Sequence, residues 1–381
     1  MDFWNPSFEY EKQADGTVLM RQVGDLPPHE PILAAYLDHF ADRTPEQIWL
    51  ARRGADGEWA KVSYSEARRH ARALGAALIA MGLGAAKPLL ILSENNIEHG
   101  LLGLACIYVG IPYAPISPAY SLVSKDHAKL KHIAALLKPG AIFADDGDIF
   151  APALASITNA GTVIINHRHG GLGAKMFDDL LAHDPEPAMK ARDAVRPETV
   201  VKYLFTSGST GAPKAVINTN GMISANQAMV RDCYQFLEGE PPVVLDWAPW
   251  NHTAASNKVS YMVLTNGGTY YIDDGKPSPV GMSLTLCNLR EIACTWYFNV
   301  PAGYDRLVTE LETDPALAST FFSRLRMIFY AGAGMAQHTW DRLAAVGRKT
   351  TGRDVLIATS LGATETAPFA LAWTEHETTA G

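Results

Sequence analysis

The sequence predicts an α/β fold of layered α/β subdomains with largely parallel sheets. Short apolar runs of strand length recur along the chain, and most are separated by stretches with helical spacing of apolar residues. This alternation favours parallel sheets covered by helices. Apolar residues make up 48% and charged residues 19% of the 381 residues, which excludes disorder, collagen and coiled coil as the dominant class. A chain of this length exceeds one compact core, so we expect two or three packing units.

Helices and strands alternate from the start of the chain. Apolar spacing predicts a helix over residues 31–40 and a second helix that begins at Ser63, where Ser63 and Glu66 form a capping box, and ends at Gly82. The run PLLILS at 88–93 is typical of a strand buried on both faces, and a helix is expected over 96–109. Later strands are expected at residues 141–144, 162–166, 200–205, 243–247, 269–273, 295–300, 327–332 and 355–360.

A polar stretch with prolines at residues 182–199 interrupts this periodicity and is the best candidate for a domain boundary. We therefore expect a first α/β subdomain over residues 1–199 and a second over 200–381, which would hold the nucleotide and acyl sites. An alternative for residues before about 62 is to pack on the second subdomain. The acidic run at 145–148 lacks the spacing and the distal Glu of a calcium loop, so it predicts a solvated turn.

Charge, apolar runs and cysteines exclude several classes of protein. The net charge is −8 and no run of five basic residues occurs, which disfavours nucleic-acid binding. The start of the chain has no secretory pattern, and the longest apolar stretch, at 101–116, is too short for a membrane span and predicts a buried helix running into a loop. Four cysteines show neither CxxC nor zinc spacing, so a reducing cytoplasm fits best: Cys106, Cys233, Cys287 and Cys294. The sequence is also compatible with a homodimer.

A loop rich in glycine and hydroxyl groups follows the expected strand at 200–205. It reads Thr206, Ser207, Gly208, Ser209, Thr210, Gly211, Ala212, Pro213 and Lys214. Glycines let backbone N–H groups converge on anionic oxygens, and the hydroxyls and the lysine add donors and charge, so the loop is suited to phosphate. It is not the P-loop of NTPases, because only two residues separate its glycines and Ala-Pro precedes the lysine. The alternative is a flexible surface turn, but α/β proteins bind ligands at such strand ends.

Two other glycine clusters test a dinucleotide site. Gly332-Ala333-Gly334 follows an expected strand, but Gln337 stands where the third glycine of the fingerprint belongs, and the cluster at 82–87 ends a helix. Neither is a Rossmann fingerprint. The first cluster still leaves room for a planar ring to approach the backbone closely.

With YAGAG at 330–334 and SLGATETAP at 360–368, the loop gives the sequence three motifs by which it resembles the adenylate-forming superfamily of acyl-CoA synthetases, firefly luciferases and peptide-synthetase adenylation domains. The phrases IPYAPISPAYSL, WAPWNHT, GGTYYIDDGKP and NLREIACTWYFNVPAGY look like the bacterial feruloyl-CoA synthetase branch. The resemblance covers about Ala34 to the end. It implies the N-terminal domain of these enzymes and an ATP-dependent carboxylic acid:CoA ligase, which forms an acyl-adenylate and then an acyl-CoA from an aromatic acid such as ferulate.

The resemblance also implies roles for individual residues, with ATP and CoA as co-substrates and Mg²⁺ as the metal. The stretch matching Thr206 to Lys214 covers the β- and γ-phosphates, with Lys214 in a catalytic role. Gly332, Ala333, Gly334 and Leu361 match adenine-binding positions; Thr364 matches a contact to the α-phosphate, and Glu365 matches the Mg²⁺ ligand. Trp247, Asn251, His252, Val300, Pro301 and Gly362 match the acyl pocket and its gate. For His252 alone, the alternative is an ordinary core or surface histidine.

Three departures from the family pattern affect these expectations. Leu361 stands where many relatives carry a tyrosine that stacks on adenine, so one base contact is expected to be weaker. In TAASNKV, after His252, three residues are expected to narrow or recharge the acyl pocket: Ala254, Ala255 and Lys258. The chain stops before the family's TGD motif, hinge and C-terminal lysine, so we expect a fragment of a longer ligase that is impaired alone. The alternatives are a truncated non-catalytic binder of nucleotide or acid, a carrier-loading enzyme and luciferase-like chemistry.

Overall fold

The computed structural model describes residues 3, 4, 6–159, 161–171, 173–207, 211–374, and its largest sheet has seven strands. The strand order is β11-β10-β6-β5-β7-β8-β9, parallel throughout except for the antiparallel pair β10–β11. The strands are β5 (Leu89–Leu92), β6 (Tyr113–Pro115), β7 (Ala141–Asp146), β8 (Val163–Arg168), β9 (Lys175–Met176), β10 (Val200–Ser207) and β11 (Pro213–Thr219).

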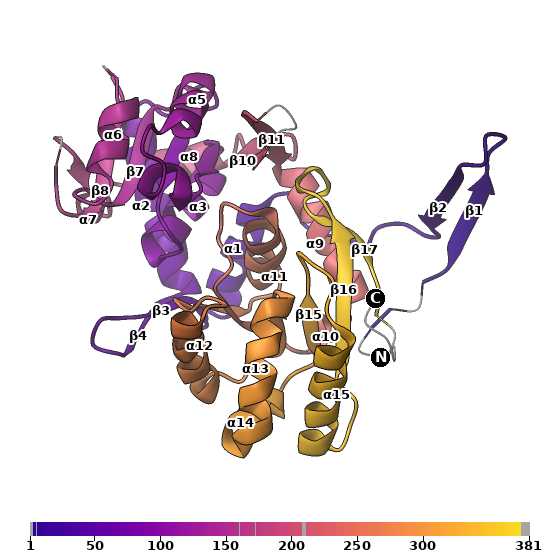
Figure 1. The fold of residues 1–381 in the computed structure, drawn as a ribbon. Coiled ribbons are helices and arrows are strands. Elements are labelled where there is room, and N and C mark those ends of the chain that lie inside the picture. The colour runs from indigo at the N-terminus through magenta and orange to yellow at the C-terminus, as the bar shows by residue number, and fades with distance from the viewer. Residues whose placement is uncertain (1–2, 5, 160, 172, 208–210, 375–381) are drawn as a thin grey trace.

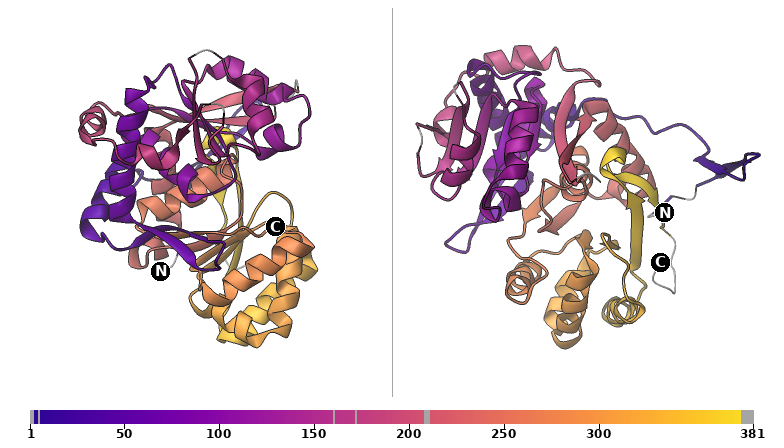
Figure 2. Two further views of the ribbon diagram at one scale, coloured as in Figure 1. Left: turned by 90° about the vertical axis from the view of Figure 1, so that its left-hand side faces the viewer. Right: turned by 45° about the horizontal axis from the view of Figure 1, so that its top comes forward.

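Helices cover both faces of this sheet, as the alternation of its apolar side chains requires (Figures 1 and 2). Leu89 and Ile91 pack toward α2, α3 and α8, whereas Leu90 and Leu92 pack toward α5 and α6. The helices are α2 (Tyr64–Ala80), α3 (Ile97–Val109), α4 (Pro118–Leu122), α5 (Ala128–Leu137), α6 (Ala151–Ile157), α7 (Phe177–Leu180) and α8 (Glu186–Arg192). The buried strands therefore lie between two helical layers.

Two four-stranded sheets form the other half of the molecule, in the orders β12-β13-β3-β4 and β14-β15-β16-β17. Their edges meet where the N–H of Thr295 donates to the carbonyl of Val243 at 2.9 Å. The strands are β3 (Ile48–Arg53), β4 (Trp59–Ser63), β12 (Val243–Asp246), β13 (Thr269–Ile272), β14 (Trp296–Asn299), β15 (Met327–Tyr330), β16 (Leu356–Gly362) and β17 (Phe369–Ala372).

These sheets are also covered on both faces (Figure 1). Tyr297 and Ile328 pack against an outer layer of α12 (Pro279–Glu291), α13 (Pro301–Thr313), α14 (Pro315–Ser323) and α15 (Gln337–Thr351). Trp296 and Phe329 face inward. The inner layer holds α1 (Leu33–Arg43), α9 (Asn220–Cys233), α10 (Phe236–Gly239), the π-helix η1 (Ala254–Val259) and α11 (Ser260–Thr265). A 3-10 turn, η2 (Thr364–Thr366), connects β16 to β17.

The expected fold class is confirmed, and the expected helices and strands are present with bounds that differ by a few residues. Helix α2 begins after Ser63 with the expected capping box. The stretch 101–116 holds the C-terminal part of α3 and then β6, a strand where a loop was expected, because β6 pairs with β5 and β10. Among the described residues, no helix combines the length and the apolar character needed to cross a membrane.

The division at residue 199/200 stays a prediction, although the pairing of strands crosses it in both directions. The β10–β11 hairpin joins the large sheet of the first part of the chain, and β3–β4 joins β13 of the second part. The hairpin β1 (Phe8–Lys12) and β2 (Val18–Gln22), which the sequence did not indicate, projects from the rest of the molecule (Figure 1).

Candidate active site

Three neighbouring parallel strands end at one edge of the sheet, and each leads into a segment that the sequence singled out. Strand β14 leads to Val300 and Pro301, β15 leads to the 332–334 segment, and β16 carries Leu361 and Gly362 before the η2 turn. The carboxyl ends of parallel strands are where α/β proteins bind ligands. We name these segments after their predicted roles: the acid gate (Val300 and Pro301), the adenine segment (residues 332–334) and the metal turn (η2). The three segments lie side by side.

The η2 turn holds Thr364 and Glu365 at this edge, with Thr364 half-buried and Glu365 exposed. Its geometry is fixed by Asn226 of α9, a residue that the sequence did not single out. The Asn226 amide donates to the carbonyls of Thr366 and Phe369, at 3.0 and 2.7 Å, and its oxygen accepts from the N–H of Phe369 at 3.2 Å. An exposed carboxylate on a turn held in this way fits the donor that nucleotide-bound Mg²⁺ takes from proteins.

Gly362 is required by the close return of the chain after this turn. A Cβ at this position would lie 1.8 Å from the carbonyl oxygen of Pro368, so no side chain fits. Gly362 therefore serves the path of the backbone between β16 and β17, and the sequence assigned it to the acyl pocket only by resemblance.

The phosphate loop connects β10 to β11, and Thr206 pairs in register with Lys214. Gly208, Ser209 and Thr210 lie outside the described residues, as does the side chain of Ser207. Gly211 has a φ of +84°, which favours glycine. The exposed Lys214 lines a groove with His132 and Tyr203, while β11 also lies beside η2. The structure thus brings the hairpin next to the metal turn.

The adenine segment is open to solvent, as Gly332, Ala333 and Gly334 are all exposed. Gly332 has a φ of +90°, and a Cβ at this position would lie 3.7 Å from Cγ1 of Val300. The segment therefore lies beside the acid gate. Leu361 is 66% exposed, so its side chain is available to a ligand on this edge.

Asn299, a buried amide that the sequence did not single out, joins Trp247, which follows β12, to Val300, which follows β14. Both of these residues are predicted to bind the acid. The side-chain oxygen of Asn299 accepts from Nε1 of Trp247 at 3.1 Å and from the N–H of Val300 at 2.9 Å, and its Nδ2 donates to the hydroxyl of Tyr297 at 3.2 Å. A polar residue at the end of the apolar run TWYFN was the available sequence signal. Asn299 fixes the position of Trp247 relative to the gate.

His252 reaches the surface just before η1, and its Nδ1 accepts from the N–H of Ala254 at 3.3 Å. Desolvation by the surrounding chain lowers the pKa of His252 below its usual 6.5, so the ring is neutral at neutral pH. A neutral ring beside the residues predicted to bind the acid can donate or accept a hydrogen bond. It neither strongly attracts nor strongly repels the carboxylate of a bound acid.

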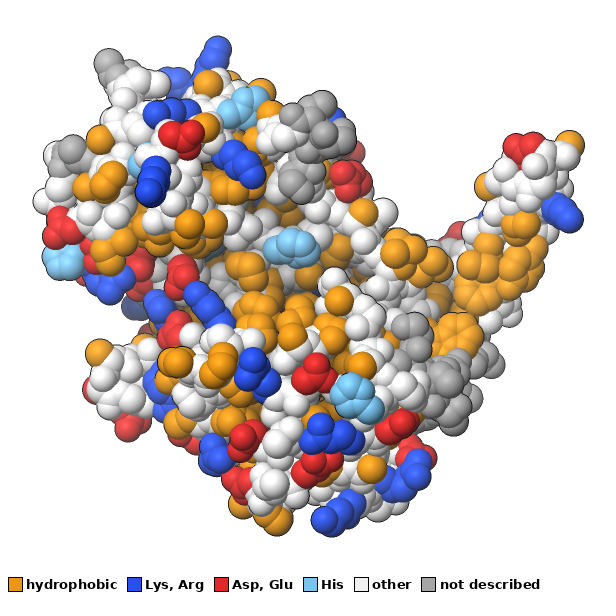
Figure 3. Space-filling view, viewed as in Figure 1, with side chains coloured by type: hydrophobic (Ala, Val, Ile, Leu, Met, Phe, Trp, Pro, Cys, Tyr) orange, Lys and Arg blue, Asp and Glu red, His pale blue; other side chains and the backbone are white. Residues whose placement is uncertain are grey.

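A cavity of about 600 Å³ lies beside this edge, in the hollow between the two halves of the molecule (Figure 3). Trp247 and Asn251 line it together with Ser93 and Asn95 from the end of β5. Asn95 also bridges to the loop after β12, since it donates to the carbonyl of Ala248 at 2.8 Å and accepts from the N–H of Trp250 at 2.9 Å. Trp247 and Asn251, which are predicted to bind the acid, therefore face this cavity. The phosphate loop and the adenine segment are not among the residues that line it.

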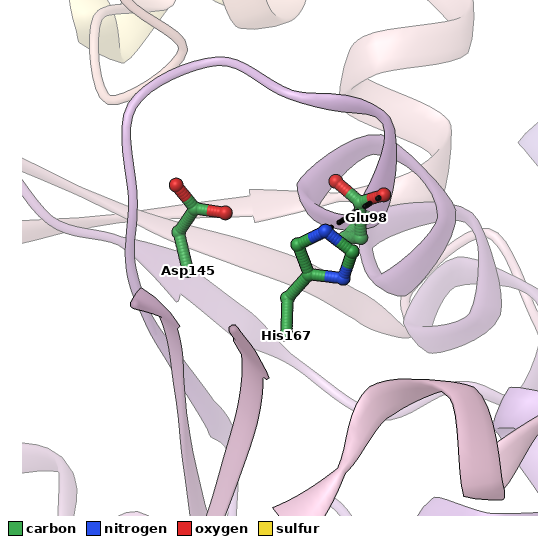
Figure 4. Close-up of side chains that lie close together, drawn as sticks. All are labelled: Glu98, Asp145 and His167. Carbon is green, nitrogen blue, oxygen red and sulfur yellow. Dashed lines mark ion pairs between the residues drawn. The ribbon is translucent and has the colours of Figure 1, made fainter. Parts of the chain in front are cut away.

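A separate cluster of Glu98, Asp145 and His167 has ligand atoms within 4.8 Å of one another (Figure 4). Nε2 of His167 lies 3.7 Å from Glu98, and Arg168 pairs with Asp145 at 2.6 Å. Since Arg168 already offsets the charge of Asp145 and His167 already contacts Glu98, we interpret the cluster as a network of polar side-chain contacts.

Comparison with known proteins identifies a matching family. The model of the "AMP-binding enzyme" family matches residues 37–381. The acyl-CoA synthetase FUM10 of Gibberella moniliformis is 24% identical over 76% of this chain, and the fatty acid–[acyl-carrier-protein] ligase MmaC of Mycobacterium marinum is 26% identical over 82% of it. The chain spans 51% and 54% of the lengths of these two relatives.

Among solved structures, the adenylation domain of a keto acid-selecting NRPS module, bound to a keto acyl adenylate, has a TM-score of 0.74. The two proteins are 16% identical, and the match covers 93% of this chain and 62% of that one. At this identity the match shows a shared fold.

Proposed function

Since this chain belongs to the AMP-binding enzyme family, we propose that it carries the nucleotide and acid sites of an ATP-dependent carboxylic acid:CoA ligase, acting in the cytoplasm on an aromatic acid such as ferulate. The observation that supports the proposal is the shared edge of β14, β15 and β16, where the three segments proposed as acid gate, adenine segment and metal turn meet. Beside this edge lies the hairpin that carries Lys214.

In the proposed reaction, the carboxylate of the acid attacks the α-phosphorus of ATP, and pyrophosphate leaves with the electron pair of the broken P–O bond. The chain needs no nucleophile of its own, since such transfer depends on positioning and on neutralising charge. Lys214 and the backbone N–H groups of the loop would hold the leaving phosphates, and Thr364 would bind an α-phosphate oxygen. Glu365 would hold Mg²⁺, which neutralises phosphate charge when bound.

The acid would lie against the gate on the β14 side. Val300 adjoins the adenine segment, and Trp247 is held beside it through Asn299. This arrangement supports an acid whose reacting carboxylate points to the α-phosphate while its body lies over the inner face of the sheet. The thiol of CoA would then attack the acyl carbon, and AMP would leave.

A second candidate is the transfer of the acyl group to a carrier protein, which the 26% identity to a carrier-protein ligase favours. The two candidates share the adenylation step and differ only in the acceptor thiol.

ATP–pyrophosphate exchange tests the shared step, with a panel of hydroxycinnamates, benzoates and aliphatic acids. We expect exchange with aromatic acids, and with CoA added we expect a thioester and AMP. Formation of ADP would contradict the proposal. Thioester formation only on a phosphopantetheine-bearing carrier would favour the second candidate, and nucleotide binding without exchange would indicate a non-catalytic binder.

A further inference from the structure

Lys258 of η1 is buried in a box of aromatic rings on the inner face of the sheet. It is 3% exposed. Its Nζ lies 3.5 Å from the ring centre of Phe329, 4.9 Å from that of Phe369 and 5.8 Å from that of Trp296, and it donates to the hydroxyl of Tyr234 at 3.1 Å. We call Lys258, Tyr234, Trp296, Phe329 and Phe369 the lysine box.

The lysine box has more hydrogen-bond donors than acceptors. A protonated lysine has three N–H donors, yet among the described residues Tyr234 is the one hydrogen-bond acceptor of Lys258, and no carboxylate there forms an ion pair with it. Nε1 of Trp296 is also buried without a partner. The thiol of Cys233 adds no negative charge at neutral pH, because burial raises its pKa to about 12. An ammonium buried in this way is costly unless an acceptor reaches it.

Three walls of the lysine box belong to elements that continue into the candidate active site. Trp296 begins β14, which ends at the acid gate; Phe329 lies in β15, which ends at the adenine segment; and Phe369 follows the metal turn. Val300 directly follows β14 and is four residues from Trp296, so this wall of the box lies roughly 13 Å from the gate along the chain. Phe298 lies between them on the same inner face.

We propose that Lys258 selects carboxylic acids that carry a second oxygen acceptor, either a phenolic oxygen or a second carboxylate, at the end remote from the reacting carboxylate. This inference rests on the proposed function and deepens it. The distal oxygen would accept from Nζ of Lys258 and so supply the acceptor that the box lacks. The aromatic walls would bind the apolar body of the acid between its two polar ends. Lys258 is thus proposed as a specificity residue, and the reacting atoms stay at the strand edge.

Pairs of acids that differ only in the distal oxygen test this inference by ATP–pyrophosphate exchange. One pair is 4-hydroxycinnamate and cinnamate, and the other is hexanedioate and hexanoate; the pair with the larger ratio identifies the source of the oxygen. We expect kcat/KM to favour the oxygen-bearing acid of one pair by about 10- to 100-fold, since a hydrogen bond to a charged group discriminates by this amount. In Lys258→Met this ratio should fall to about 1, and Lys258→Arg should restore part of it.

Lys202→Met is the matched control. Lys202 is also fully buried, and its Nζ donates to the carbonyl of Ser256 at 3.2 Å beside the rings of Tyr113 and Tyr261. Lys202→Met should change the free energy of unfolding in the same direction as Lys258→Met. It should leave the ratio of kcat/KM values within each acid pair unchanged. If Lys258→Met does not fold, Tyr234→Phe offers a second variant that changes the box without removing the charge, and it should alter the ratio by a smaller factor.

A thermal-shift measurement with the same acids separates this inference from the proposed function. If no acid supports exchange, yet the oxygen-bearing acids raise the Tm of the wild-type chain and not that of Lys258→Met, the proposed reaction is wrong and the inference stands. Exchange with equal kcat/KM for the two acids of each pair would overturn the inference about Lys258 and leave the proposed function standing. The absence of both exchange and any Tm difference between paired acids would overturn both.

Discussion

The rim and the floor of the candidate site are built in opposite ways. At the rim, the glycines at 332 and 334, Leu361, Glu365 and Lys214 are all exposed and act through backbone or through single polar groups. At the floor, the lysine box is almost fully buried, with no member more than 4% exposed. The rim is open to a ligand as it stands, whereas the floor could hold only a ligand that replaces what fills it now.

Under the proposed function, the two regions would divide the task of recognition between them. A phosphate or an adenine ring would offer the same atoms in every reaction, so backbone donors and one carboxylate that holds Mg²⁺ at the rim would suffice for it. An acid is distinguished by its shape and by its remote polar groups, and buried donors discriminate more strongly because leaving them unpaired is costly. We therefore expect changes at the rim to alter rate and nucleotide affinity, and changes at the floor to alter stability and acid selectivity.

The largest effect on rate is expected at the rim, from Glu365→Gln. Removing the charge from the proposed metal ligand should lower pyrophosphate exchange by about 10- to 100-fold and raise the Mg²⁺ concentration needed for half-maximal rate. The Tm should change little, since Glu365 is exposed. Glu238→Gln, at an exposed glutamate of α10, is the control and should keep the wild-type Mg²⁺ dependence. An unchanged Mg²⁺ dependence in Glu365→Gln would remove this residue from the site.

The largest effect on stability is expected at the floor, from Lys258→Met. Burial lowers the pKa of Lys258 from 10.5 to about 7. The unfolded chain therefore binds more protons than the native chain between about pH 7 and 10.5, and Lys258 makes the free energy of unfolding rise with pH over this window. Below it, the native chain carries the full cost of a buried charge. The facing groups Tyr234 and Cys233 stay neutral near pH 7, because burial raises the pKa of both.

Lys258→Met should therefore raise the free energy of unfolding at pH 7 by roughly 1–4 kcal/mol and flatten its rise toward pH 10. Urea unfolding at several pH values measures both effects. The exposed Lys349→Met should reproduce the wild-type curve. A loss of stability at pH 7 in Lys258→Met would mean that the contacts of the ammonium with Tyr234 and the rings outweigh its burial.

The sequence singles out the segments of the rim and, at the floor, Lys258 alone, and the reason for this difference is physical. The segments at 206–214, 330–334 and 360–368 are contiguous in the chain, and their glycines and hydroxyls indicate their chemistry. The floor forms from long-range contacts, such as that of Lys258 with Phe329 and Phe369. Asn226 and Asn299 were missed because their partners lie on other elements. The pairing of β3 with β13 was open for the same reason, since it joins Leu50 to Tyr270.

A smaller effect confined to the nucleotide is expected from Lys214→Ala. Its proposed partner is the polyphosphate, so the KM for ATP should rise by about tenfold, with a much smaller change in the KM for the acid. Initial-rate measurements of exchange with each substrate varied in turn separate the two constants. Equal increases in both would indicate that Lys214 supports the β10–β11 hairpin instead, and would weaken the distinction between rim and floor.

The smallest effect is expected from adding an aromatic ring at the rim with Leu361→Tyr. Leu361 is 66% exposed at the end of β16, so a larger side chain meets no steric barrier in the free protein. A tyrosine there could stack on adenine, and an aromatic pair contributes about 0.5–1.5 kcal/mol, which corresponds to a two- to tenfold lower Kd for ATP. Calorimetric titration with ATP measures this change, and the ratio of acid selectivities should stay constant because the floor is untouched. Leu284→Tyr, at an exposed leucine of α12, controls for the added surface ring. If Leu361→Tyr altered acid selectivity as strongly as nucleotide affinity, the rim and the floor would have to act as one coupled surface.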